Sequence, residues 1–204
     1  MPLQNRVQPT GQIIATPARG LFMGNRGILH DEQQRLGAVR WRHKAWITCA
    51  LAFKGRRRGL MTPHSYTELF FLDEAVALAA GHRPCAECRR ADFNRFGAAW
   101  ALAQGGAARA PAMDAALHRA RVTRDRRQIT HMADIAALPD SAFVALPGGK
   151  ICLVLGAFLW PYRPEGYASP LPRPAGGNVT VLTPRPAVAV LAAGYRPTLH
   201  PSAA

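Results

Sequence analysis

Fifteen residues near the middle of the chain, Glu74-Ala-Val-Ala-Leu-Ala-Ala-Gly-His-Arg-Pro-Cys-Ala-Glu-Cys88, decide how the fold is organised. Asp73 directly before them can cap a helix through Ala80, because its carboxylate accepts hydrogen bonds from the free N–H groups of the first turn. Gly81 suits the left-handed residue that ends a helix, and Pro84 prevents the helix from continuing. The stretch therefore predicts a short Ala-rich helix, a stop, and then a pair of cysteines.

The residues before this stretch predict two strands and a turn. Trp46–Phe53 and Tyr66–Leu72 are rich in aromatic and β-branched residues, and Lys54–Gly59 between them has the composition of a turn. We expect the two strands to pair as a hairpin that leads into the helix. Residues 1–45 show no clean periodicity and are punctuated by glycines, so they predict an irregular N-terminal segment of loops with a short strand.

The residues after the cysteine pair predict more helices and then a change of character. Two helices are expected over Cys88–Gln104 and Pro111–Arg124. Strands are then expected at Ala142–Leu146, Ile151–Leu155 and Val179–Leu182. Residues Leu159–Pro174 predict a Pro-rich loop, and Thr183 can cap a last helix that ends at Gly194.

Four cysteines occur in the chain, and two of them, Cys85 and Cys88, form a C-x2-C pair at the helix stop. A turn in this place can present both thiolates to one tetrahedral ion, and zinc would need two more ligands. In the expected hairpin Cys49 faces His64, and the helix returns toward that point. The predicted Zn2+ site is therefore Cys49, His64, Cys85 and Cys88, with Cys152 competing for the fourth place. A redox pair and two small core residues are the alternatives for the C-x2-C pair.

Together these elements predict an α+β fold, with a hairpin–helix zinc module followed by helices and a β-rich C-terminal part. We expect an irregular N-terminal segment at 1–45, a zinc-binding hairpin–helix domain at 46–130 and the β-rich part at 131–204. One internal repeat stands out, because Leu78–Pro84 matches Leu191–Pro197 at six of seven positions. The repeat indicates either convergence on a good helix stop or a duplicated strand–helix unit.

The stretch Glu74–Cys88 resembles the zinc-binding domain of Ada-type DNA alkylation-repair proteins. The zinc module of that family has a strand, a helix that ends in Ala-Ala-Gly-aromatic-Arg-Pro, and a C-x2-C pair, and the resemblance covers about residues 46–92. The family takes its other two ligands from an upstream C-x3-C pair; Cys49 stands at the first of these positions, and Phe53 stands at the second. The resemblance implies a nucleic-acid context, and it implies that only Cys49 can be the methyl-accepting cysteine of a repair reaction.

The charge balance indicates a polyanionic partner. Lys and Arg number 26 against 12 Asp and Glu, which gives a net charge of +14. No acid occurs between Glu32 and Glu68, and Trp41 and Trp46 are interleaved with the basic residues of that window. The predicted nucleic-acid-binding residues, for DNA rather than RNA, are Arg40, Trp41, Arg42, Lys44, Arg56, Arg57, Arg58, Arg89 and Arg90. The alternatives are compositional drift, since only three basic residues are Lys, and a solvated rim around core tryptophans.

Two other function classes compete with a zinc-containing DNA-binding protein. One is a metal-dependent nuclease or hydrolase that uses His30 or His131, and the other is an interaction protein whose zinc only stabilises the fold. The glycine-rich stretch Gly20–Asp31 lacks the Gly-Lys-Ser/Thr ending of a phosphate-binding loop. The longest apolar run, Ile151–Trp160, has ten residues, whereas a membrane-spanning helix needs about 20. The N-terminus shows no signal pattern, so we expect a cytoplasmic protein with reduced thiols.

Overall fold

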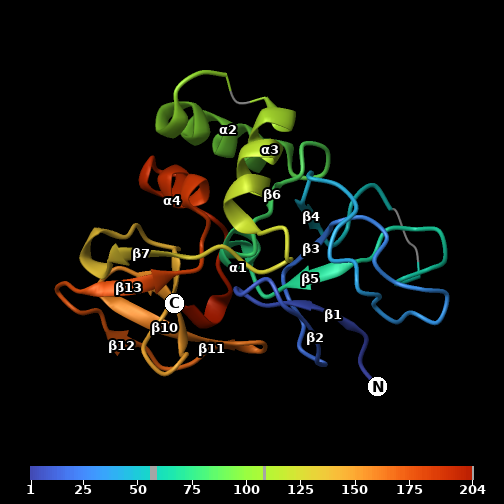
Figure 1. Ribbon diagram of the computed structural model, residues 1–204, viewed down its shortest axis with the longest axis horizontal. Coiled ribbons are helices and arrows are strands. Elements are labelled where there is room, and N and C mark those ends of the chain that lie inside the picture. Colours follow the sequence, from blue (N-terminus) through green and yellow to red (C-terminus); the bar gives the residue numbers. More distant parts are fainter. Residues whose placement is uncertain (56–58, 108, 204) are drawn as a thin grey trace.

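The computed structural model describes residues 1–55, 59–107 and 109–203, and in these residues the chain forms two sheets and four α-helices. Figure 1 shows the two sheets side by side, with helix α1 between them and the other three helices gathered over one side. The expected α+β class is confirmed, as is the order of helices followed by a β-rich C-terminal part.

The first sheet contains six strands in the order β2-β1-β5-β3-β4-β6. These strands are β1 (Gln4–Val7), β2 (Ile13–Ala15), β3 (Phe22–Asn25), β4 (Ile47–Ala50), β5 (Leu69–Phe71) and β6 (Arg83–Pro84). Residues 1–45 therefore supply three strands rather than mostly loops. The expected hairpin is wrong, because β3 lies between β4 and β5 and pairs with both of them.

The physical reason for both corrections lies in β3. The strand has only four residues and contains Gly24, so it shows neither alternation nor β-branched enrichment. Gly24 is needed because a Cβ atom there would lie 2.1 Å from the carbonyl oxygen of Ile47 on β4. The close approach that the glycine allows is a tertiary feature, and local patterns do not reveal it.

Helix α1 (Glu74–Ala79) begins and ends as expected. The Asp73 carboxylate accepts a hydrogen bond from the N–H of Val76 at 2.9 Å, and Gly81 has a positive φ of 83°. In the second copy of the repeat, Gly194 after α4 (Arg185–Ala192) also has a positive φ, of 99°. The two copies thus share a helix stop, although only the first continues into a strand, β6.

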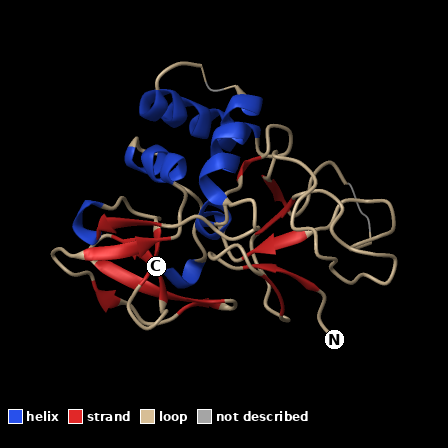
Figure 2. Cartoon of the chain, viewed as in Figure 1, coloured by secondary structure: helices blue, strands red, loops and turns tan. Residues whose placement is uncertain are grey.

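The N-cap of α4 differs from the expectation. Pro184 occupies this position, and the Thr183 hydroxyl instead accepts a hydrogen bond from the N–H of Phe143 at 2.9 Å. Helix α4 packs against the two longer helices, α2 (Arg90–Gln104) and α3 (Ala110–Arg121), in the helical layer of Figure 2. Their shared core includes Phe96, Trp100, Met113, Leu117, Leu191 and Tyr195.

The second sheet has the order β11-β10-β9-β8-β13-β7, with β12 paired to β10. Its strands are β7 (His131–Asp134), β8 (Phe143–Ala145), β9 (Ile151–Leu155), β10 (Phe158–Arg163), β11 (Gly166–Tyr167), β12 (Leu171–Pro172) and β13 (Asn178–Val181). The three strands expected in this part are confirmed. The expected Pro-rich loop at 159–174 is wrong, because most of β10 and all of β11 and β12 fall in it. Proline is tolerated on β12 because that short strand pairs only with β10.

The beginning of α1 joins the two halves of the molecule. Asp73 accepts hydrogen bonds from the Tyr167 hydroxyl at 2.7 Å and from the N–H of His200 at 3.1 Å. Glu74 accepts a hydrogen bond from the Tyr195 hydroxyl at 2.6 Å. One core cluster also spans α1 and both sheets, so the halves pack as one body, while the three-part division of the chain stays a prediction. None of the described helices has the length and apolar character needed to cross a membrane.

Candidate metal centre

The pairing of β4 with β6 brings the cysteines together. The two strands run parallel, with Ile47 opposite Arg83 and Thr48 opposite Pro84, so the next residues, Cys49 and Cys85, are neighbours. The N–H of Cys85 continues the pairing by donating to the carbonyl oxygen of Thr48 at 2.9 Å. A turn then leads back, and Cys88 lies just before α2.

Three thiols meet at this point. The sulfur atoms of Cys49, Cys85 and Cys88 all lie within 4.8 Å of one another. Two sulfurs bound to one zinc ion at about 2.3 Å would lie about 3.8 Å apart, which is compatible with this spacing. Thiolates are the ligands that zinc prefers in structural sites. The three cysteines therefore lie close enough to bind a metal ion.

Backbone donors support the negative charge that such a site needs. The N–H of Glu87 donates to the Cys85 sulfur at 3.4 Å, and the N–H of Ala50 is directed at Cys88. The pKa of Cys85 is lowered to about 5, first because the Cys49 thiol donates to its sulfur. The same hydrogen bond raises the pKa of Cys49, and burial raises the pKa of Cys88. One thiolate is thus favoured in the metal-free protein, and a cation would stabilise the other two.

A pocket of about 650 Å³ opens beside the thiols, and all three cysteines line it. Its wall also includes Glu68, which is 1% exposed. The Oε2 atom of Glu68 accepts a hydrogen bond from the N–H of Met61 at 2.7 Å, whereas its Oε1 atom has no hydrogen-bond partner in the described part of the chain. The described residues supply three ligand atoms, so a zinc ion held here would need a fourth ligand, and a water molecule or a bound ligand could supply it.

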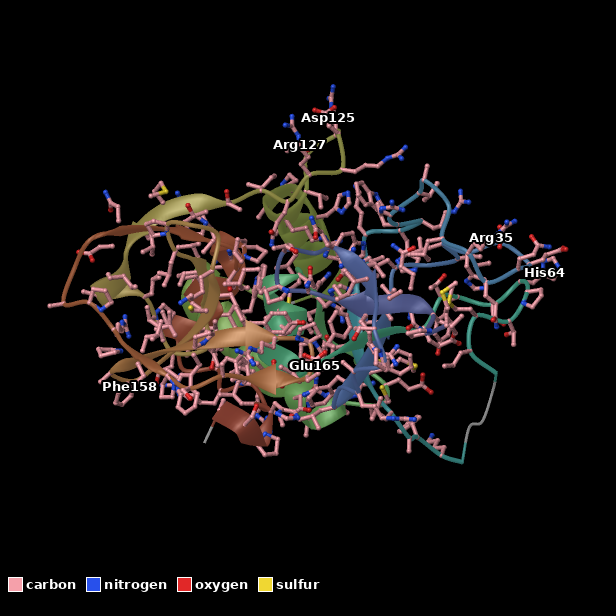
Figure 3. The ribbon with its side chains drawn as sticks, turned by 90° about the horizontal axis from the view of Figure 1, so that it is seen from below. Arg35, His64, Asp125, Arg127, Phe158 and Glu165 are labelled. Atoms are coloured by element: carbon pink, nitrogen blue, oxygen red, sulfur yellow. The ribbon has the colours of Figure 1, made fainter. Side chains whose placement is uncertain are left out.

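The two candidates for the fourth ligand do not lie with the thiols. Figure 3 shows His64 at the outer edge of the molecule, where it is exposed and has a positive φ of 63°. Its assignment rested on a hairpin between β4 and β5, and β3 replaces that pairing. Cys152 lies in β9 of the other sheet, fully buried among Val144, Val154 and other apolar side chains. All four cysteines are free of disulfides.

The predicted nucleic-acid residues are divided among three settings. Arg42, Lys44 and Arg90 are exposed, and Arg40 and Trp41 are half-buried. Arg89 is unsuitable for a surface contact, because it is buried and pairs with Glu74 at 2.8 Å and with Asp92 at 2.6 Å. The predicted contacts at Arg56, Arg57 and Arg58 lie outside the described residues.

The candidate catalytic histidines are also apart from the thiols. His30 lies 2.6 Å from the Thr67 hydroxyl and 3.2 Å from the Thr62 carbonyl, so both of its ring nitrogens are engaged. His131 is on β7, in the second sheet. Sequence reasoning missed Glu68, and no local pattern marks it, since it is a lone acid before a short strand. Arg26 belongs to the glycine-rich stretch Gly20–Asp31, but its burial beside the distant Arg121 was not predicted.

Comparisons of the chain with protein-family models, with curated proteins and with solved structures find no match. The Ada-type resemblance of residues 46–92 therefore stays an expectation from the sequence.

Proposed function

We propose that the chain is a zinc-binding protein that binds nucleic acid, with DNA as the first expectation. The observation that carries the proposal is the meeting of Cys49, Cys85 and Cys88 within 4.8 Å. Zinc is favoured over harder divalent ions because the donor set consists of thiols. Because the site joins β4, β6 and the start of α2, a bound ion would also stabilise this part of the fold.

The metal part of the proposal is tested by elemental analysis of protein purified without chelator. One zinc per chain is expected, and Cys85→Ser should lose it. Cys152→Ala is the matched control, because it removes a buried cysteine from the other sheet and should keep the metal. Substitution by cobalt should give the charge-transfer bands of several thiolates. A metal-free wild-type protein, or equal metal loss in both variants, would contradict the proposal.

The nucleic-acid part rests on the net charge of +14 and on the exposed basic residues beside the first sheet. If Arg42 and Lys44 each neutralise one phosphate of duplex DNA, the slope of log affinity against log salt should fall by about 0.9 for each residue that is replaced. The double variant Arg42→Gln/Lys44→Gln should therefore lose about 2 units of slope. The matched control is Arg163→Gln/Arg185→Gln, which removes the same charge from exposed positions in the C-terminal part. Equal slopes in both variants would show that net charge alone drives binding.

A repair role is the narrowest form of the proposal. It would require methyl transfer from a DNA phosphotriester to the sulfur of Cys49. Phe53 stands where the Ada-type family has its fourth cysteine, so we expect no methylated Cys49 after incubation with methylated DNA. Mass spectrometry of the peptide that contains Cys49 settles this point, and a methyl group on Cys85 or Cys88 would contradict the assignment.

A hydrolase is the second candidate, and the pocket of about 650 Å³ favours it. Catalytic zinc sites combine three protein ligands with a water molecule in the fourth position. A carboxylate such as Glu68 could accept the proton of that water. Turnover of a phosphate ester or amide that is lost in Glu68→Gln, with the zinc content unchanged, would favour this candidate over a structural zinc.

A further inference from the structure

A second pocket, of about 390 Å³, has an unusually cationic wall. Among the residues that the structure describes, no carboxylate lines it and five arginines do: Arg26, Arg40, Arg121, Arg126 and Arg127. Trp41 and Trp46 form its aromatic wall. None of the three cysteines takes part in this pocket, so it is distinct from the metal centre.

Two of the arginines are buried against the ring of one tryptophan. The guanidinium carbons of Arg26 and Arg121 lie 3.9 and 3.7 Å from the ring centre of Trp46. Arg26 and Arg121 are only 2% and 1% exposed. Stacking on the ring fixes the orientation of both guanidinium planes. Their N–H groups then point away from the ring and can donate hydrogen bonds to other groups.

The acceptors of the hydrogen bonds from these two guanidinium groups are neutral. Arg26 donates to the Nε2 atom of His82 at 3.3 Å and to the carbonyl oxygen of Gly11 at 3.4 Å. Arg121 donates to the carbonyl oxygens of Gly81 at 2.7 Å and of Lys44 at 2.8 Å. Within the part of the chain that the structure describes, neither arginine has an ion-pair partner.

Each of the two arginines also has an N–H donor that is not used. The Nη2 atom of Arg26 and the Nε atom of Arg121 are buried without a hydrogen-bond partner among the described residues. Burial, and then the positive charge of Arg40, lowers the pKa of Arg26. Burial, and then the charge of Arg26, lowers the pKa of Arg121. The charge of Asp114 partly offsets these effects on Arg121, but that carboxylate is already paired with Arg83. Two like charges in the interior without an ion pair of their own are costly, and an anion in the pocket would reduce that cost.

We propose that this pocket binds a phosphate group joined to a flat aromatic base, as in one nucleotide unit. Several guanidinium groups converging on one space suit the oxygens of a phosphate. A volume of about 390 Å³ is at the small end of ligand pockets, which fits a mononucleotide. Trp41 is half-buried and offers a stacking surface for the base. The unit can come from a free nucleotide or from the phosphorylated end of a strand.

The binding of an anion in this pocket follows from its arginines. The choice of a phosphate that carries a base rests on the proposed nucleic-acid function. Binding is measured by calorimetry with four probes: AMP, inorganic phosphate, adenosine, and a short single-stranded oligonucleotide with or without a 5′-phosphate. AMP should bind more tightly than phosphate, and adenosine should not bind. A strand end is the source if the 5′-phosphate raises the affinity of the oligonucleotide above that of AMP, and a free nucleotide is the source if it does not.

Two matched variants each replace one exposed arginine. Arg126→Gln removes a guanidinium from the pocket rim, and Arg119→Gln removes one from the surface of α3 outside the pocket. Arg126→Gln should weaken AMP binding about tenfold, which corresponds to one charge-assisted hydrogen bond, and Arg119→Gln should leave it unchanged. Equal effects of the two variants, or no binding of AMP, phosphate and phosphorylated strand by the wild type, would overturn the proposal.

Arg26→Gln separates a binding role from a structural one. If Arg26 is kept for an anion, removing its buried charge should preserve or raise the melting temperature of the ligand-free protein, and AMP should no longer raise it. A lower melting temperature together with an undiminished AMP effect would overturn the proposal. Duplex binding with a normal salt slope in Arg126→Gln would leave the proposed nucleic-acid function standing even if the pocket binds nothing.

Discussion

Replacement of Asp114 by Ala tests a buried ion pair in which both carboxylate oxygens are bound. Both carboxylate oxygens of Asp114, on α3, accept hydrogen bonds from Arg83 at 2.8 Å, one from Nε and one from Nη2. The two side chains are 5% and 9% exposed. The pair holds α3 against β6, two residues before Cys85.

The magnitude follows from what the variant leaves behind. In Asp114→Ala the guanidinium of Arg83 stays buried without its counter-charge, and removing one partner of a buried pair costs about 3–5 kcal/mol. Replacing both partners by apolar residues removes the unpaired charge as well. The double variant Arg83→Met/Asp114→Leu should therefore recover most of the loss, even though it lacks the ion pair.

Urea unfolding of the wild type and the variants measures these differences. The control is Asp125→Ala, which breaks an ion pair with Arg127 on a projecting loop where the two side chains are 75% and 80% exposed (Figure 3). The control should change the free energy of unfolding by less than about 0.5 kcal/mol. A loss below about 1 kcal/mol in Asp114→Ala, or a double variant no more stable than Asp114→Ala, would refute the reasoning.

Three further outcomes follow from single contacts. Tyr195→Phe removes a buried donor to Glu74 and should cost about 1.5–3 kcal/mol in urea unfolding, the range for a hydrogen bond to a charged group. Gly24→Ala places a methyl group 2.1 Å from a backbone oxygen of β4 and should cost about 1–3 kcal/mol or more. Burial lowers the pKa of His82, so below about pH 6.5 the unfolded chain binds a proton that the folded protein does not. The free energy of unfolding should then fall by up to about 1.4 kcal/mol for each unit of acidification, and His82→Gln should flatten that slope.

The helices could be predicted because their signals are local. Asp73 and Gly81 mark the ends of α1 within a few residues of one another, and the structure places both as expected. The strands β1, β2 and β3 carry no such signal, because each has three or four residues and is defined by its neighbours in the sheet. The strand β10 was hidden for another reason, since the prolines around it indicate a loop when no partner strand is known.

In the candidate site, too, some residues follow from local sequence and others depend on the tertiary fold. Cys85 and Cys88 are neighbours in sequence, so their shared site follows from spacing alone. Cys49 was expected through a hairpin, and the structure brings it to the pair through the parallel pairing of β4 and β6 instead. His64 fails because its place depended entirely on that hairpin. The buried Arg26 and Arg121 are 95 positions apart in the chain, and only the fold brings both to Trp46.

Adjacent residues of one chain segment line the two pockets. Ile47, Cys49 and Ala50 of β4 line the metal pocket, while Trp46, directly before the strand, lines the arginine pocket. The carbonyl of Trp46 accepts a hydrogen bond from the N–H of Arg83 at 3.1 Å, so β6 holds both ends of this segment. An ion bound to Cys49 and Cys85 would clamp β4 to β6, and the clamp would also fix the ring on which Arg26 and Arg121 are stacked. A metal that never touches the second pocket can therefore still determine whether that pocket has its shape.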